Sequence, residues 1–341
     1  MNIKLEKLRY IKVVRQNLPK QYEDWLASLT GPVVFDVEGK IKHKWRVVSV
    51  LVHGNEPSGF IAVHRWLLSL DTPYTNVRFV VSSVEAAKQQ PLFSTRFVDG
   101  VTDLNRSFNS KDTSCEVQTR AASIKQAIAE VKPEAVVDMH NTSGSSPAFC
   151  VTTRIDMAVQ ALASFFCQTV MYTRLKLGSL MEQDFDCPIV TLECGGAKDQ
   201  IAHEMAYQGL HEFLAVEDIF SGHHLKLVDI VEHPLRLEFN HDYSLIFAEH
   251  KDESKDVTLV SDIEQHNMGT TRADCFIGWS NTGIEAFTVR NEQGDVQSSH
   301  LLYCEEGKLY TVHPMRIFMA TSNLEIAKKD CLFYGFCVDE A

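Results

Sequence analysis

The chain has 341 residues, enough for one large domain or two unequal domains. Apolar residues make up 45% of it, which supports a sizeable core, and its formal net charge of −12 lacks the basic excess that nucleic-acid binding requires. No segment approaches the roughly 18–20 uncharged apolar residues of a membrane span, and the charged N-terminal stretch does not resemble a secretory signal. We therefore expect a globular protein that binds neither nucleic acid nor membranes.

Cysteine usage bears on the cellular compartment. The nine cysteines are scattered, several lie in apolar strand-like runs, and no CxxC pair occurs. This pattern favours reduced thiols in a cytoplasmic protein over a disulfide framework or a cysteine-based zinc site.

Strand-like and helix-like segments alternate between residue 46 and about residue 220. Apolar runs predict buried strands, and amphipathic spacing predicts helices. The predicted strands cover 46–53, 77–82, 135–140, 148–153 and 188–194, and the predicted helices cover 60–70, 115–131, 156–171 and 199–220. This alternation favours an α/β domain with a mostly parallel sheet flanked by helices.

The pattern of apolar and polar residues changes near residue 222. Short alternating runs with turn signals between them follow at 235–239, 244–250, 285–291 and 301–313. We therefore predict an α/β domain over residues 1–222 and a smaller, mainly β domain over residues 223–341.

The first candidate metal ligands directly follow a predicted buried strand. His53 and Glu56 are three residues apart in the sequence HGNE, and Gly54 lets the backbone turn between them. An imidazole and a carboxylate leaving a strand together can converge on one cation, and zinc accepts both donor types. Alone, this short pattern is more often an ordinary polar loop.

A third candidate ligand, His140, ends the predicted strand AVVDMH, where open α/β sheets place their ligand sites. Asp138 shares a face of that strand with it, because strand side chains alternate. Together with His53 and Glu56, His140 completes three protein ligands and leaves a position open for water, which is typical of a catalytic zinc.

Glu193 lies late in the apolar strand PIVTLEC, directly before Cys194 and Gly195. A carboxylate in such a strand costs desolvation unless something compensates it. A salt-bridged structural residue would explain it, and so would a general base that takes a proton from a zinc-activated water and returns it to the leaving amine.

A polar loop supplies candidate substrate-binding residues. It contains Arg96 and the sequence DLNR, which runs from Asp103 through Asn105 to Arg106. Guanidinium groups grip carboxylates in a bidentate manner, and one arginine can also stabilise an oxyanion. As isolated residues, these would more often be ordinary surface side chains.

Together, HGNE, DLNR, DMHNT and the buried glutamate before Gly195 resemble the succinylglutamate desuccinylase/aspartoacylase family of the zinc-carboxypeptidase-like superfamily. Their order and spacing match over roughly residues 46–220, and the small β-rich C-terminal part fits the family's architecture. The resemblance implies one Zn²⁺ per chain and hydrolysis of the amide bond of a small N-acyl amino acid. Carried over by position, it makes His53, Glu56 and His140 the zinc ligands, and Glu193 the general base and acid.

The resemblance also implies roles for the polar loop. Asp103 corresponds to a carboxylate that orients the ligand His53. Arg96 corresponds to the arginine that polarises the scissile carbonyl, and Asn105 and Arg106 to the pair that holds the substrate's carboxylate.

One position departs from the family pattern. Members that act on acidic acyl groups resemble one another in an arginine ten residues before the catalytic glutamate, and here that position is Gln183 within an acidic run. This favours a neutral or basic acyl group over succinyl. Two alternatives remain: a metallocarboxypeptidase that acts on short peptides, and a zinc-binding relative without catalytic activity.

Overall fold

The computed structural model describes residues 5–112, 114–221, 226–291, 293–294, 296, 298–329 and 331–338. The chain divides into two compact units. Unit 1 comprises Met1–Asn141 and Ala148–Ile230, and unit 2 comprises Thr142–Pro147 and Val231–Ala341. The domain boundary predicted near residue 222 lies outside the described residues.

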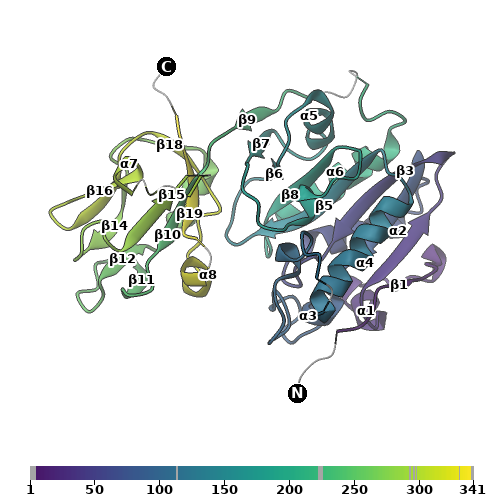
Figure 1. The fold of residues 1–341 in the computed structure, drawn as a ribbon, viewed down its shortest axis with the longest axis horizontal. Coiled ribbons are helices and arrows are strands. Elements are labelled where there is room, and N and C mark those ends of the chain that lie inside the picture. The colour runs from purple at the N-terminus through teal and green to yellow at the C-terminus, as the bar shows by residue number, and fades with distance from the viewer. Residues whose placement is uncertain are drawn as a thin grey trace. The chain divides into compact units, whose positions relative to one another are not determined.

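A mixed, mostly parallel sheet forms the centre of unit 1 (Figure 1). Strand β3 pairs in parallel with both β4 and β5, whereas the β2–β4 and β6–β8 pairs are antiparallel. The strands lie in the spatial order β1 (Arg9–Tyr10), β2 (Val33–Val37), β4 (Thr75–Val81), β3 (Ile41–Val50), β5 (Ala135–Thr142), β8 (Ile189–Gly196), β6 (Phe149–Thr152), β7 (Thr169–Tyr172) and β9 (Asp229–Val231). The predicted α/β fold class is confirmed.

Helices cover both faces of this sheet, because its strands are apolar on both faces. Val48 and Phe79 belong to the core under one group of helices, while their neighbours Val47 and Val80 pack under α4 (Glu116–Glu130) on the other face. The first group consists of α1 (Tyr22–Ser28), α2 (Ser58–Ser69), α5 (Met157–Ala163) and α6 (Gln200–Ala215). The short helices are α3 (Val84–Ala87) and the 3₁₀ turns η1 (Arg15–Asn17), η2 (Leu104–Arg106) and η3 (Leu180–Glu182).

The helix predicted over 156–171 is wrong in its second half. Asp156 does cap the helix, since its carboxylate accepts a hydrogen bond from the Val159 amide at 2.8 Å. However, α5 ends at Ala163, and residues 169–172 form strand β7 beside β6. The β-branched Thr169 and Val170 favour an extended strand that can pair with a neighbour. The predicted helix 199–220 also ends early, at Ala215.

Unit 2 is mainly β, as predicted, and its strands form two sheets around a shared core. One sheet has the order β13 (Thr270–Thr271), β18 (Met315–Phe318), β19 (Phe333–Cys337), β10 (Leu235–Phe239) and β15 (Phe287–Arg290). The other has the order β11 (Leu245–Ala248), β12 (Val257–Val260), β14 (Phe276–Ser280), β17 (Lys308–Thr311) and β16 (Leu302–Glu305). Helices α7 (Ser298–Leu301), α8 (Leu324–Lys329) and η4 (Ile263–Met268) complete the unit.

The segment Thr142–Pro147, which begins at the last residue of β5, belongs to unit 2. Glu264 holds it there, because its carboxylate accepts hydrogen bonds from the amides of Ser145 and Ser322, both at 2.9 Å. Asn267 also donates to the carbonyl oxygen of Ser145 at 2.8 Å. None of the described helices is long and apolar enough to cross a membrane.

Candidate active site

The first two candidate ligands lie in the turn between β3 and α2. Leu51 has a positive φ of 53°, so the chain turns sharply as it leaves the strand. A side chain at Gly54 would lie only 2.6 Å from the Cβ of Ala86, so glycine is required for this close approach. The turn presents His53 and Glu56 side by side, at 3% and 5% exposure.

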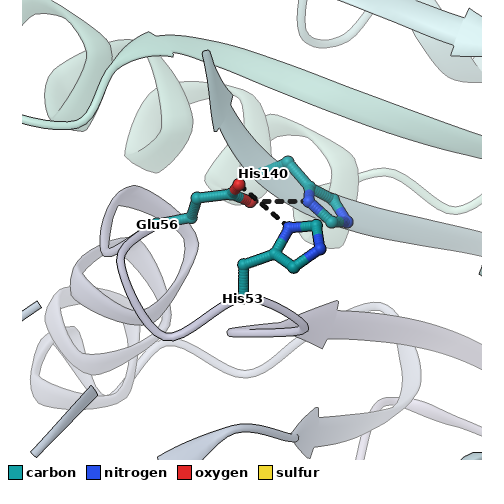
Figure 2. Close-up of side chains that lie close together, drawn as sticks. All are labelled: His53, Glu56 and His140. Atoms are coloured by element: carbon teal, nitrogen blue, oxygen red, sulfur yellow. Dashed lines mark hydrogen bonds and ion pairs between the residues drawn. The ribbon is translucent and has the colours of Figure 1, made fainter. Parts of the chain in front are cut away.

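The third candidate ligand, His140, faces them from β5. Its Nδ1 lies 2.6 Å from Oε2 of Glu56, and Nδ1 of His53 lies 2.9 Å from Oε1 of the same carboxylate. Figure 2 shows the carboxylate of Glu56 facing both imidazoles, with a dashed line to each. One ligand atom from each of the three residues lies within 4.8 Å of the others, so the structure brings the predicted triad together as a group able to hold a metal ion.

Two further carboxylates orient the imidazoles. Nε2 of His53 lies 3.0 Å from Asp103, and Nε2 of His140 lies 2.8 Å from Asp138. With each Nε2–H donating to its carboxylate, Nδ1 is the ring nitrogen that faces Glu56, and a metal ion bound there would replace a proton on it. Asp103 therefore contacts His53 as predicted, and Asp138 makes the equivalent contact to His140.

Opposite charges dominate the protonation of this cluster. Burial disfavours ionisation of Glu56, but the charges of His53 and His140 outweigh burial and hold its pKa well below the usual range. Burial likewise disfavours the charged form of His140, yet Asp138 and Glu56 raise the pKa of His140 well above its usual value. The site therefore stabilises positive charge between its carboxylates.

Glu193 lies on β8, the neighbour of β5 in the sheet, and is 8% exposed. Burial raises the pKa of Glu193 from 4.5 to about 7; the charge of His140 opposes this rise and that of Glu56 adds to it. Its Oε2 has no hydrogen-bond partner within the described part of the chain. A carboxylate with a near-neutral pKa and a free oxygen is suited to exchange protons at physiological pH.

The polar loop reaches the same cluster. The Gly54 amide donates to the Arg96 carbonyl oxygen at 2.9 Å, which places this arginine beside the ligand turn. Its guanidinium lies 3.2 Å from Glu56 and 3.2 Å from Asp103, and its side chain is 37% exposed. Arg96 is therefore close enough to the candidate ligands to meet a molecule bound among them.

The next residues of the loop leave their donor groups available. The oxygen Oδ1 of Asn105 accepts from the Leu180 amide at 3.0 Å, which fixes this side chain and leaves its Nδ2 as a donor. Arg106 is exposed and donates to the Asn105 carbonyl oxygen at 3.1 Å, and it forms no ion pair with any described carboxylate. Both positions suit the binding of a carboxylate.

Gln183 is 7% exposed, and its amide is fully engaged. Its Oε1 accepts from Lys125 at 2.8 Å, while Nε2 donates to Asn109 at 2.6 Å and to the Ser179 carbonyl at 3.1 Å. The neighbouring carboxylate of Glu182 caps the preceding loop by accepting from the Leu177 amide at 2.7 Å. In this acidic run, Glu182 thus makes structural contacts, and Asp184 and Asp186 are exposed.

Residues 47–214 match the family model described as the succinylglutamate desuccinylase/aspartoacylase catalytic domain. These residues form a catalytic domain of this family. The predicted motifs, from His53 to Glu193, all lie within the matched residues. The recognition made from the sequence is confirmed.

Solved structures of the same fold include a succinylglutamate desuccinylase from Vibrio parahaemolyticus, with a TM-score of 0.57 at 13% identity over 94% of this chain and 96% of that one. The corresponding protein from Vibrio cholerae has a TM-score of 0.53 at 12% identity, covering 93% and 99% of the two chains. An aspartoacylase family protein from Mesorhizobium loti has a TM-score of 0.53 at 13% identity, covering 90% and 89%. These likenesses concern the fold. No curated protein matches the chain in sequence.

Three further polar residues, Asp138, Ser58 and Asn141, support the site. The spacing of Asp138 and His140 on one strand face is the sequence signal for the contact between them. Ser58 and Asn141 are adjacent or close to ligands in the sequence, but their mutual hydrogen bonds depend on how two strands and a helix pack.

Proposed function

We propose that this protein is a zinc-dependent hydrolase that cleaves the amide bond of an N-acyl amino acid. The observation that carries the proposal is the buried group of His53, Glu56 and His140, with an oxygen of Glu193 on the adjacent strand that has no hydrogen-bond partner among the described residues. Family membership in the succinylglutamate desuccinylase/aspartoacylase group supports the same reaction class.

The donor set fits zinc. Two imidazoles and one carboxylate are ligands that zinc prefers, and three protein ligands are typical of a catalytic site. The Nε2–Asp contacts leave both Nδ1 atoms available as ligand atoms, and Glu56 is held ionised. A zinc ion held here would act as a Lewis acid that lowers the pKa of water and polarises a carbonyl.

The protein's own residues then move the proton and stabilise charge. Glu193 would accept a proton from the attacking water and donate it to the leaving nitrogen, and a pKa of about 7 suits a group that does both near neutral pH. Arg96 would donate hydrogen bonds to the carbonyl oxygen as negative charge develops on it. Burial of Glu193 among apolar strands strengthens these electrostatic effects.

The binding groups constrain the substrate. Asn105 and Arg106 would hold one carboxylate with their remaining donor groups, so we infer a substrate with a free amino-acid carboxylate. Gln183 offers no guanidinium, and its amide is already bonded to Lys125 and Asn109. We therefore propose a neutral or basic acyl group. The neighbouring acidic residues do not add to this argument, because Glu182 is engaged with backbone amides.

The test is a panel of N-acyl amino acids and short peptides, assayed with zinc-loaded protein. We expect turnover of N-acyl amino acids, with a higher kcat/KM for an N-acetyl compound than for the N-succinyl derivative of the same amino acid. Preference for the succinyl compound would overturn the acyl-group proposal. Turnover of peptides alone would identify a carboxypeptidase, and zinc binding with no turnover across the panel would identify a non-catalytic relative.

A further inference from the structure

The residue after His140 forms a buried hydrogen-bonded junction. Asn141 is 4% exposed and lies at the end of β5. Its Oδ1 accepts from the Ser58 amide at 3.0 Å, and its Nδ2 donates to Ser58 Oγ and to the Gly195 carbonyl oxygen, both at 2.7 Å. One side chain therefore joins three segments of the chain.

The orientation of this amide is determined by its partners. A flipped Asn141 would place its oxygen against the Gly195 carbonyl and its NH₂ group against the Ser58 amide, losing both bonds. Since Nδ2 donates to Ser58 Oγ, the hydroxyl is free to donate in turn to Nδ1 of His203, 2.7 Å away. Each of these four hydrogen bonds therefore has one donor and one acceptor.

Each joined segment carries a residue of the proposed mechanism. Ser58 begins α2 two residues after Glu56, and Pro57 provides no side-chain cap, so Asn141 satisfies an amide in the first turn. Gly195 follows Glu193 by two residues and has φ of 106°, a conformation that favours glycine.

We propose that Asn141 is a positioning residue that holds the strand carrying Glu193 in place against the turn carrying His53 and Glu56. This inference rests on the proposed function, in which Glu193 exchanges the proton. Asn141 itself need not touch the substrate. Its amide has two side-chain torsions and three buried bonds, so it restrains both segments closely.

The expected effect follows from the geometry of proton transfer. A misplacement of about 1 Å can reduce the rate by about 10²-fold. Loss of the Asn141 side chain leaves all three candidate zinc ligands in the chain. It removes the hydrogen bond to the Gly195 carbonyl oxygen, and so allows Glu193 to shift. Supporting residues around metal sites typically affect activity by about 10–100-fold.

The test compares Asn141→Ala with the control His203→Gln, which keeps an acceptor for Ser58 and leaves all three Asn141 bonds intact. On the best substrate of the panel, we expect Asn141→Ala to lower kcat by about 10–100-fold with little change in KM. In a Glu193→Gln background the same substitution should lower kcat little further, because both changes act through one group. His203→Gln should stay close to the wild-type rate.

Two measurements do not depend on turnover. Calorimetry with Zn²⁺ alone should give one bound ion per chain in Asn141→Ala, and its crystal structure should show Glu193 displaced relative to His140. Loss of zinc, additive effects with Glu193→Gln, or an undisplaced Glu193 would overturn the proposal. A displaced Glu193 in a protein with no turnover would refute only the proposed function. If Asn141→Ala does not fold, Asn141→Ser is measured in the same way.

Discussion

The site has two halves that are held in different ways. The buried half lies on β5 and β8, where Asp138, His140 and Glu193 are at most 8% exposed. Asp138 orients His140 from two positions earlier on the same strand. In the loop half, Arg96 is 37% exposed, and Asp103 orients His53 from 50 positions further along the chain.

This difference separates two tasks. Sheet hydrogen bonds and the contact of Asn141 with the Gly195 carbonyl hold the buried half, so its side chains keep a constant geometry for metal binding and proton transfer. Loops adapt more easily to a ligand, and binding residues are often found on them. We therefore expect substitutions in the buried half to affect zinc binding and kcat. Substitution of Arg106, at the exposed end of the loop half, should affect KM.

The largest effect should follow His140→Ala, which removes a proposed ligand from the buried half. We expect about one zinc per chain in the wild type, and loss of metal and activity together in the variant. Elemental analysis beside a rate assay measures both. His211→Ala, outside the site, should keep its zinc, and zinc retained by His140→Ala would place the metal elsewhere.

Glu193→Gln should keep zinc but lower kcat by about 10²–10⁴-fold, because it preserves the shape of the side chain and removes its basicity. Steady-state kinetics on zinc-loaded protein measures the change. An unchanged rate would show that another group transfers the proton and that the buried half serves the metal alone.

The raised pKa of Glu193 predicts how pH affects the stability of metal-free protein. The folded protein holds this proton up to about pH 7, whereas the unfolded chain loses it near its usual 4.5. The resulting stabilisation is present below pH 4.5 and is lost as pH rises through 7, and it amounts to on the order of 2–3 kcal/mol between pH 5 and 8. Urea unfolding of the wild type and Glu193→Gln at both pH values measures this component. An equal pH response in the two proteins would contradict it.

The two orienting carboxylates allow a direct comparison of the halves. Asp138→Asn and Asp103→Asn should each weaken zinc binding by about 10–100-fold. The effect should be larger for Asp138, whose side chain is 0% exposed against 15% for Asp103, because burial strengthens a charged hydrogen bond. Competition with a chelator measures both affinities, and the reverse order would show that burial does not set the difference.

The smallest effect is expected at the exposed end of the loop half. Arg106→Lys keeps the charge but loses the bidentate fork, so KM should rise by about tenfold or less while kcat stays similar. Steady-state kinetics on an N-acyl amino acid measures this split. A fall in kcat with an unchanged KM would assign Arg106 to the chemical step.

The sequence by itself determined the fold class and identified the candidate metal ligands. His53 and Glu56 follow an apolar run that ends in a glycine-containing turn, and His140 ends another. These signals are local, since strand burial and turn chemistry depend on neighbouring residues. The motif order then identified the family, which the match over residues 47–214 confirmed.

Only the tertiary structure decided which polar groups meet. Asn141 bonds Ser58 and Gly195 across more than 50 positions in each direction, and Gln183 is bonded to Lys125 instead of being left free in an acidic run. The end of α5 and the pairing of β7 with β6 could not be predicted from the sequence either. Such contacts depend on sheet register and helix packing, because a buried polar group is stable only beside the partner that the fold provides.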